Sequence, residues 1–343
     1  MIYFNSDYLE GAHPSIMVRL AETNMVQTVG YGEDEYCEAA REKIKTACQA
    51  PEADVHFLVG GTQTNLTVIA ACLKPWQGVI SAVSGHINCH EAGAIESTGH
   101  KVITLPTTNG KITAQQVQDY VEWHRNDEST EHIVQPGMVY ISHPTEGGTL
   151  YTKAELTALY DTCGLPLFID GARLGYGLMA EESDMTLPEI ARLCDVFYIG
   201  GTKVGALFGE AVVIMNENLK KDFRFIMKQR GGRMAKGRLL GVQFDTLFTD
   251  DLYFKISRHA IEMAHQIRDI FVSAGYPLLF DSPTNQQYPI MSDDELAILG
   301  KSFGYEYWER VDETHSGVRF CASWATKQEH VDALRAAVNA LKK

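Results

Sequence analysis

The stretch Asp195-Val-Phe-Tyr-Ile-Gly-Gly-Thr-Lys-Val-Gly-Ala-Leu-Phe-Gly209 decides how the rest of the chain is interpreted. An apolar run typical of a buried strand stops at two glycines, and the loop that follows presents Lys203. Apolar neighbours desolvate an amine, which disfavours its charged form and makes it a better nucleophile toward a carbonyl. The pattern therefore suggests a lysine that forms a Schiff base, although a solvated lysine in a surface turn fits the same letters.

A second strand upstream ends in a similar way. The run Pro166-Leu-Phe-Ile-Asp-Gly-Ala-Arg173 places Asp170 at the end of an apolar strand, directly before small residues. Residues 187–194 have a helical pattern, so the segment predicts a right-handed βαβ unit whose two strands end at one edge of a sheet. Asp170 and Lys203 should then face one pocket. A carboxylate beside a Schiff-base lysine suits pyridoxal phosphate, whose pyridine nitrogen needs an anionic partner.

The bulk composition limits the possible classes of function. At 343 residues the chain exceeds one typical core, so we expect a large domain over residues 1–245 and a small one over residues 246–343. The formal net charge of -14 disfavours nucleic acid and anionic membranes as partners. The N-terminus has no signal-peptide pattern, and no uncharged run reaches the ~18 apolar residues of a membrane span. These features predict a cytoplasmic protein.

The cysteines and histidines predict neither a disulfide frame nor a metal site. The cysteines are scattered, odd in number and free of C-x-x-C pairs: Cys37, Cys48, Cys72, Cys89, Cys163, Cys194 and Cys321. This pattern is typical of thiols in a reducing compartment. His86 and His90 lie four residues apart beside Glu91, but their order matches neither H-E-x-x-H nor H-x-x-E-H.

Other strand ends also carry residues suited to a cofactor. Residues 55–72 predict a strand, a Gly-Gly turn and a helix start, and the free N–H groups of such a turn make Gly61, Thr62 and Gln63 candidates for binding a phosphate. A plain capped helix is the alternative, since neither G-x-G-x-x-G nor a P-loop is present. His86 follows the strand 79–84 and begins a helix over residues 85–94, and His143 ends a further strand. A ring such as that of His86 can stack on an aromatic cofactor.

The alternation of strands and helices up to Phe208 predicts an α/β fold with a mainly parallel sheet covered by helices on both faces. The basic stretch 227–241 can complete a phosphate site, although a solvated loop is the simpler interpretation. Residues 252–274 have the spacing of one long amphipathic helix that bridges two domains, and the remainder predicts a small α+β domain. Arg319 lies in the apolar strand 318–322, so it needs an anion, either an internal carboxylate or a bound substrate.

Together these residues resemble the low-specificity threonine aldolases of the β-eliminating lyase group, pyridoxal phosphate enzymes of the aspartate aminotransferase fold (fold type I). The matching motifs run from Ser6 to the last helix: Ser6-Asp7, Tyr31-Gly-Glu-Asp34, Gly61-Thr62, His86-Ile with Glu91-Ala-Gly-Ala94, His143 before Gly147-Gly148, Asp170-Gly-Ala-Arg173, Lys203 and Arg319. The resemblance implies a large cofactor-binding domain with an N-terminal arm and a seven-stranded sheet, a small C-terminal α+β domain, and a homotetramer with sites at dimer interfaces.

The resemblance also implies roles for individual residues. Lys203 holds the cofactor covalently, Asp170 contacts its pyridine nitrogen, and His86 stacks on its ring. The expected cofactor-binding residues are Gly61, Thr62, Gln63, His86, Asp170, Arg173, Thr202 and Lys203. The expected substrate-binding residues are Ser6, Tyr31, Arg173 and Arg319, and His143 matches the histidine near the substrate hydroxyl.

Two motifs depart from the family pattern. Where typical members have Ser-Lys-Gly at the cofactor lysine, this chain has Thr202-Lys203-Val204. Where they have Gly-Gly-Gly-Met-Arg-Gln, it has Gly231-Gly-Arg-Met-Ala-Lys236, so the arginine that reaches a phosphate, in some members from a neighbouring subunit, is displaced. Arg233, Lys236 or Arg238 are the candidates to replace it.

The expected reaction is the cleavage of threonine, allo-threonine or another β-hydroxy-α-amino acid to glycine and an aldehyde. His143, directly or through water, is expected to take the β-hydroxyl proton. The alternatives are a β-eliminating lyase acting on another amino acid and a protein that binds pyridoxal phosphate without catalysis. A nucleotide-binding module is disfavoured because the glycine fingerprints are absent.

Overall fold

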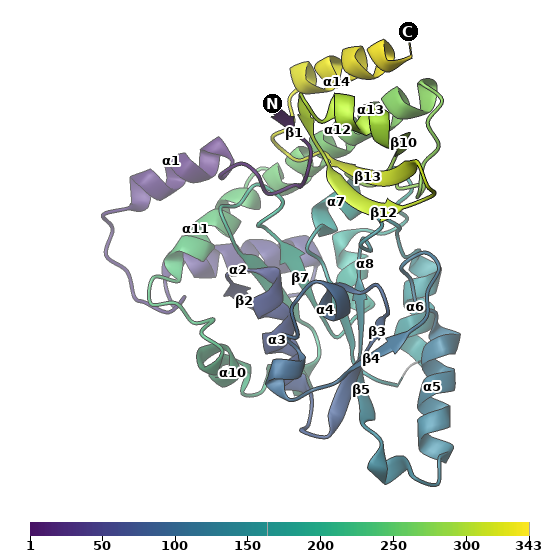
Figure 1. The fold of residues 1–343 in the computed structure, drawn as a ribbon. Helices are drawn as coiled ribbons and strands as arrows, with labels where there is room; N and C mark the ends of the chain where they lie inside the picture. The colour runs from purple at the N-terminus through teal and green to yellow at the C-terminus, as the bar shows by residue number, and fades with distance from the viewer. Residues whose placement is uncertain (163, 343) are drawn as a thin grey trace.

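The computed structural model describes residues 1–162 and 164–342, which form a sheet lobe and a smaller lobe that lies above it in Figure 1. The sheet lobe is built on seven strands in the order β2-β8-β7-β6-β5-β3-β4. Their bounds are Asp54–Leu58 (β2), Gln77–Ala82 (β3), Val102–Leu105 (β4), Gln135–Ser142 (β5), Leu167–Asp170 (β6), Val196–Gly200 (β7) and Glu210–Ile214 (β8). β8 runs antiparallel to both of its neighbours, and the other pairings are parallel. The prediction of a mainly parallel α/β sheet is therefore confirmed.

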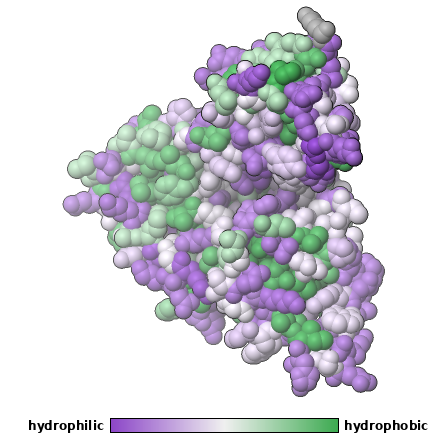
Figure 2. All heavy atoms as spheres, viewed as in Figure 1, coloured by the Kyte–Doolittle hydropathy of each residue, from purple (hydrophilic) through white to green (hydrophobic). Residues whose placement is uncertain are grey.

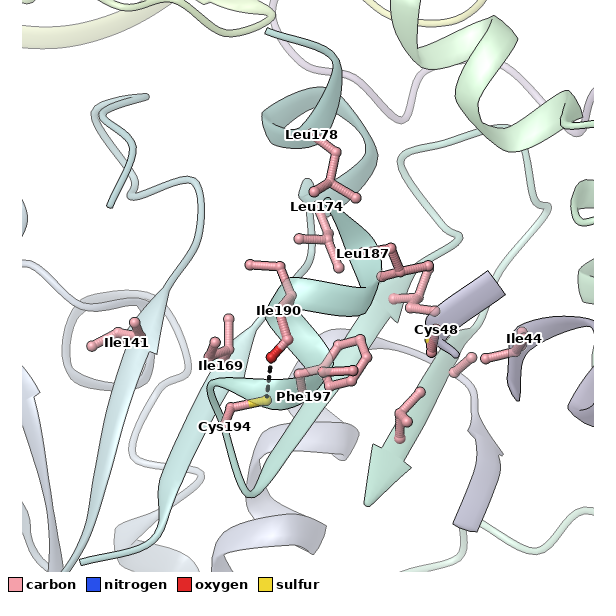
Figure 3. Packing of buried hydrophobic residues seen from close by; sticks show 14 of the residues in the cluster. Ile44, Cys48, Ile141, Ile169, Leu174, Leu178, Leu187, Ile190, Cys194 and Phe197 are labelled. Carbon is pink, nitrogen blue, oxygen red and sulfur yellow. Dashed lines mark hydrogen bonds between the residues drawn. The ribbon is translucent and has the colours of Figure 1, made fainter. Parts of the chain in front are cut away.

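Helices cover both faces of this sheet. One face packs against α2 (Glu35–Cys48), α5 (Ala114–Asn126), α6 (Lys153–Thr162), α7 (Leu174–Met179), α8 (Leu187–Arg192) and α11 (Arg238–Leu247), and the other against α3 (Gly61–Cys72), α4 (His86–Cys89) and α10 (Phe223–Gln229). Side chains alternate between the two cores, so Ile141 of β5 faces the first core and Tyr140 the second. Ile141, Ile169 and Phe197, from three adjacent strands, and Leu174 of α7 all belong to the first core (Figure 3).

The smaller lobe combines the C-terminal part of the chain with its first residues. Its strands are β9 (Gln286–Gln287), β10 (Ile290–Ser292), β12 (Glu306–Arg310) and β13 (His315–Cys321), and its helices are α13 (Asp293–Leu299) and α14 (Gln328–Leu341). β1 (Ile2–Tyr3) pairs in parallel with β11 (Phe303–Gly304), and Phe4 belongs to the core of this lobe. The N-terminal arm therefore packs with the C-terminal part of the chain. The predicted division at residue 245 stays a prediction.

α12 (Leu252–Ser273) joins the two lobes. Ile256 and Ala260, in its first half, are buried in the core of the sheet lobe, and Ile267 and Phe271, in its second half, are buried in the core of the smaller lobe. A single amphipathic helix thus contributes to both cores. The predicted long bridging helix is confirmed.

Local sequence signals explain where several helices begin and end. α1 (Pro14–Thr23) begins with a proline, whose fixed φ angle suits the first position of a helix, and the Asp34 carboxylate caps α2 by accepting the Cys37 N–H at 2.9 Å. The helix expected over residues 85–94 is wrong in length, because α4 ends at Cys89 and Ala92 and Gly93 have φ angles of 49° and 74°. A right-handed helix cannot continue through such backbone. Within the described residues, no helix has the length and apolar character needed to cross a membrane.

Candidate active site

A cleft of about 660 Å³ lies between the carboxyl ends of the sheet strands and the smaller lobe. Figure 2 shows the surface hollowed between the two lobes. The cleft is lined by strand ends and the start of α3 on one side and by β12 and β13 on the other. Most of the predicted site residues line it: Gly61, Thr62, His86, Asp170, Arg173, Thr202, Lys203 and Arg319.

Asp170 is the last residue of β6, on the face of the sheet that α3 covers. Its oxygens accept four hydrogen bonds of 2.5–3.0 Å, from the Tyr198 hydroxyl, the Ala172 N–H, the Tyr140 hydroxyl and the Asn65 amide. Burial raises the pKa of Asp170, but His86 and the hydrogen bonds from Tyr140, Tyr198 and Asn65 outweigh burial and lower it. Asp170 is thus an ionised carboxylate held in one orientation in the wall of the cleft.

Lys203 lies in the turn that follows β7, and its carbonyl accepts a hydrogen bond from the Tyr176 hydroxyl at 2.5 Å. The Nζ atom lies 6.0 Å from the centroid of the Tyr8 ring, and no ion pair joins it to another described residue. Burial and the nearby Arg173 lower the pKa of the amine more than the surrounding carboxylates raise it. Lys203 is therefore a desolvated amine suited to attack a carbonyl.

The start of α3 faces the same cleft. Gly60 precedes the helix without a side chain to cap it, and the first helical bond runs from the Thr64 N–H to the Gly60 carbonyl at 3.0 Å. The earlier N–H groups, which include those of Gly61 and Thr62, remain free for an anion. Gln63 turns away from the cleft, since its amide donates to the Arg230 carbonyl at 3.1 Å.

Thr202 connects the lysine turn to a buried acid. Its hydroxyl donates to Glu210 at 2.9 Å, and the second oxygen of Glu210 accepts the Gly201 N–H at 3.0 Å. Burial raises the pKa of Glu210 to about 8, although Thr202, Gly201 and Lys203 oppose the shift. A carboxyl that is protonated at neutral pH adds no negative charge to this wall of the cleft.

His86 begins α4, and its orientation is fixed by a chain of polar side chains. The ring Nδ1 lies 2.8 Å from Glu91 Oε1, which also accepts the Asn65 amide at 2.7 Å, and the same amide contacts Asp170. Burial lowers the pKa of His86, but Glu91 and Asp170 outweigh burial and raise it. The ring therefore carries its proton toward Glu91.

Two arginines line the cleft, and they differ in their partners. Arg173 makes a bidentate contact with Asp7 at 2.7 and 3.0 Å. Burial raises the pKa of Asp7, but the positive charges of Arg173 and Lys203 outweigh burial and lower this pKa to about 2. Arg319 instead donates to the Gln286 amide at 3.1 Å and to the Asn5 carbonyl at 2.9 Å. No ion pair joins Arg319 to a carboxylate within the described parts of the chain. Arg319 thus brings an unneutralised positive charge to the cleft.

The structure does not bring Ser6, Tyr31 or His143 into the cleft of their own chain. Ser6 is buried between Asn5 and Asp7, which contact the two arginines. Tyr31 is 45 % exposed, with its ring 4.5 Å from the Lys228 amine.

His143 is buried behind the cleft. Its Nδ1 accepts only the Tyr151 N–H, at 3.4 Å, and its Nε2 is buried without a partner among the described residues. Burial lowers the pKa of His143 to about 4. The role of His143 stays a prediction that this placement does not support.

Sequence reasoning missed the residues that support the predicted ones. Tyr140 and Tyr198 each stand between two apolar residues of a strand, and a buried tyrosine hydroxyl usually has a partner, so a sequence signal existed for both. Glu146 lines the cleft from the turn after β5, before the Gly-Gly pair. No sequence signal joins Asn65 to Glu91, because Asn65 lies in α3 and Glu91 in the loop after α4, and the two meet only in the fold.

The chain matches the sequence profile described as beta-eliminating lyase over residues 4–338. It is 29 % identical over 337 residues to a low specificity L-threonine aldolase of Pseudomonas aeruginosa, with 96 % of this chain and 95 % of the relative covered. The solved structure of a threonine aldolase of Leishmania major superposes with a TM-score of 0.97 at 42 % identity and covers all of both chains.

A histidinol-phosphate aminotransferase of Clostridium acetobutylicum superposes with a TM-score of 0.72 at 12 % identity, covering 100 % of this chain and 99 % of that one. This more distant likeness concerns the fold alone, and it agrees with the predicted fold class. The match over residues 4–338 confirms the resemblance drawn from the motifs, and the chain belongs to the beta-eliminating lyase family.

Proposed function

We propose that the protein is a pyridoxal phosphate-dependent lyase that cleaves threonine, allo-threonine or related β-hydroxy-α-amino acids to glycine and an aldehyde. The observation that carries this proposal is the meeting, in one cleft, of a desolvated amine, an ionised buried carboxylate, an open helix start and two guanidinium groups. The named activity of the relatives from Pseudomonas aeruginosa and Leishmania major, which are similar over nearly the whole chain, supports it.

The residues of the cleft fit pyridoxal phosphate. Lys203 provides the amine for its aldehyde, Asp170 the anion for its pyridine nitrogen, and the N–H groups of Gly61 and Thr62 the donors for its phosphate. His86 provides a ring for stacking. When bound, the cofactor supplies the electron sink that lets a bond at the substrate Cα break.

Arg319 and Arg173 hold the substrate carboxylate. Asp7 fixes Arg173, and the Asn5 carbonyl fixes Arg319, so the N-terminal arm orients both guanidinium groups. Ser6, which lies between these two arm residues, is proposed to contact the same carboxylate. A fixed carboxylate restricts rotation about the bonds at Cα, and this restriction decides which bond is placed to break.

The test is a product analysis with the cofactor supplied. L-allo-threonine and L-threonine should each give glycine and acetaldehyde in equal amounts, whereas an eliminating lyase would release ammonia and a keto acid from serine or another amino acid. Formation of ammonia and a keto acid, or the absence of any turnover, would refute the proposed aldol cleavage.

We further propose that two copies of the chain associate, and that dimers pair into a homotetramer. Exposed apolar side chains gather on α1 and the segment after it, where Figure 2 shows a hydrophobic patch at the left of the view: Met17, Val18, Met25, Val26 and Val29. None of the basic residues of positions 230–238 lines the cleft of its own chain. Arg233 and Tyr31 are proposed to reach the cleft of a second copy, and light scattering of the purified protein tests the subunit number.

The cytoplasm is the proposed compartment. The cysteines that the structure describes are free thiols, which a reducing compartment preserves, and Cys163 lies outside the described residues. Nucleic acid and membranes remain disfavoured as partners by the net charge of -14.

A further inference from the structure

Glu146 is a cleft residue without a role in the reaction described so far. It lies in the turn after β5 and lines the cleft. Two hydrogen bonds from other residues reach the same oxygen, Oε1: one from the Ser142 hydroxyl at 2.6 Å and one from the His86 N–H at 2.9 Å. No donor from another described residue contacts Oε2. One oxygen therefore fixes the side chain, and the other remains available to a ligand in the cleft.

The other polar groups near the cofactor residues are already engaged. Asp170 accepts four hydrogen bonds, and both oxygens of Glu210 accept donors from the lysine turn. The Nδ1 of His86 contacts Glu91, and His143 does not line the cleft. The second oxygen of Glu91 also has no partner among the described residues, but Glu91 does not line the cleft. Glu146 is thus the cleft-lining carboxylate beside His86 that keeps an oxygen without a donor from another described residue.

The turn that carries Glu146 is tied to the arginine proposed to bind the substrate. The Glu146 carbonyl accepts the Tyr288 hydroxyl at 2.8 Å and the Gln286 amide at 3.4 Å. The amide oxygen of Gln286 accepts Arg319 at 3.1 Å. One short strand, β9, thereby holds both Arg319 and the Glu146 turn. A substrate bound to Arg319 through its carboxylate has a fixed position relative to Glu146.

We propose that Glu146 is the catalytic base that accepts the β-hydroxyl proton of the substrate, an inference that rests on the proposed function. The hydroxyl O–H bond breaks and its proton passes to the free oxygen of Glu146. The Cβ–O bond becomes the carbonyl of the aldehyde as the Cα–Cβ bond breaks. The electron pair of that bond stays with the glycine fragment, which takes a proton from water at Cα, and Glu146 gives its proton back to water, so that no net proton is gained or lost.

The surroundings of Glu146 suit this role. Burial raises the pKa of Glu146 and the charge of Asp170 adds to the rise, although Ser142 and His86 oppose it. A carboxylate with a raised pKa binds a proton more readily near neutral pH than an exposed glutamate does.

Glu146→Gln tests the inference, because the amide preserves the shape and can still accept the Ser142 and His86 donors but cannot take a proton. Cleavage of L-allo-threonine should slow by about 10²- to 10⁴-fold, the usual contribution of a general base. Exchange of a glycine Cα hydrogen with deuterated water involves no β-hydroxyl, so it should be retained. Cofactor binding, titrated by absorbance, and the melting temperature should match the parent protein.

Two further variants keep the test decisive. Glu306→Gln makes the same chemical change at another cleft-lining carboxylate and should leave the ratio of cleavage to exchange at the parental value. Glu146→Asp keeps a carboxylate and should preserve this ratio better than Glu146→Gln does. The aspartate variant also provides a test if the glutamine variant fails to fold. Cleavage by Glu146→Gln at the parental rate, or an equal loss of cleavage and exchange, would overturn the role of Glu146. Failure of the parent protein to cleave allo-threonine would instead refute the proposed function itself.

Discussion

The two walls of the cleft are built in different ways. On the sheet-lobe wall, the partners of Asp170 come from neighbouring strands, α3 and the adjoining turn. On the smaller-lobe wall, Arg319 is held by the Asn5 carbonyl of the N-terminal arm and by Gln286 of a two-residue strand. Regular secondary structure therefore fixes the sheet-lobe wall, here called the cofactor wall. Contacts between residues far apart in the sequence fix the smaller-lobe wall, here called the substrate wall. We expect changes to the first wall to abolish chemistry and changes to the second to weaken substrate binding.

The largest effect is expected for Lys203→Ala. Purified parent protein with pyridoxal phosphate should be yellow, and borohydride should attach the cofactor to the chain at Lys203, because burial lowers the pKa of this amine and no ion pair joins it to another residue that the structure describes. The variant should lose the absorbance, the attachment and the cleavage activity together. Peptide mapping of the reduced protein checks the position, and labelling at another lysine would contradict the assignment.

A smaller but still large loss is expected for Asp170→Asn. A neutral amide cannot balance a protonated pyridine nitrogen, so kcat should fall by about 10²- to 10³-fold, as for the loss of other preorganised electrostatic contacts. The variant should still bind the cofactor, which an absorbance titration measures. A variant that turns over at the parental rate would remove Asp170 from the mechanism.

On the substrate wall, Arg319→Lys should act mainly on substrate binding. Lysine keeps the charge but loses the planar fork, so KM for threonine should rise on the order of tenfold, with a smaller fall in kcat. Arg310→Lys is the matched control, since Arg310 is a half-exposed arginine of the neighbouring strand that pairs with Asp293. Unchanged kinetics with a lowered melting temperature in Arg319→Lys would assign Arg319 to structure alone.

The smallest effect on catalysis is expected at His143, which lies behind the cofactor wall. His143→Gln should change kcat little, but it should alter the pH dependence of stability. The histidine pKa falls from 6.5 to about 4 on folding, so between these values the unfolded chain binds a proton that the folded chain does not. The free energy of unfolding of the parent should therefore fall as the pH drops through this window, by up to about 3 kcal/mol from this residue.

Urea unfolding at pH 8 and pH 5 measures this difference. The variant should lose less stability than the parent over this interval, although His56, whose pKa burial also lowers, to about 3, keeps part of the slope in both proteins. If the variant instead keeps the parental pH dependence of stability and loses most of its kcat, His143 takes part in the reaction.

The cofactor wall was the more predictable of the two from sequence. Strand ends followed by small residues identify Asp170, Lys203 and the turn at Gly61 because parallel strands end at one edge of a sheet, and the structure brings all three to one cleft. The cost of an unpaired charge in an apolar strand led to the prediction that Arg319 binds an anion. The residues that hold Arg319, Asn5 and Gln286, could not be predicted, because they meet it only through tertiary packing.

Glu146, which we propose as the catalytic base, was harder to predict than the cofactor residues. His143 was predicted from its residue type and its place at the end of a strand, whereas the irregular turn that carries Glu146 is held through its backbone by Tyr288 and Gln286, far away in sequence. Residue type and strand position therefore indicated the turn in which Glu146 lies, but not that the Glu146 side chain lines the cleft. The length of α4 was missed for a related reason, because positive φ angles at Ala92 and Gly93 are set by the loop rather than by composition.

The contacts of the N-terminal arm also determine how early during translation the smaller-lobe wall of the cleft can form. Asn5 is translated 314 residues before the Arg319 that it contacts, whereas the last strand of the large sheet ends at Ile214. The strands that carry the proposed cofactor residues can therefore assemble before the C-terminal part of the chain is made, and α11 and the first half of α12 complete their core afterwards. The N-terminal arm can pack only after β11 and β13 have been translated. The substrate wall therefore forms last, and a nascent chain forms the cofactor wall before it can bind the amino acid.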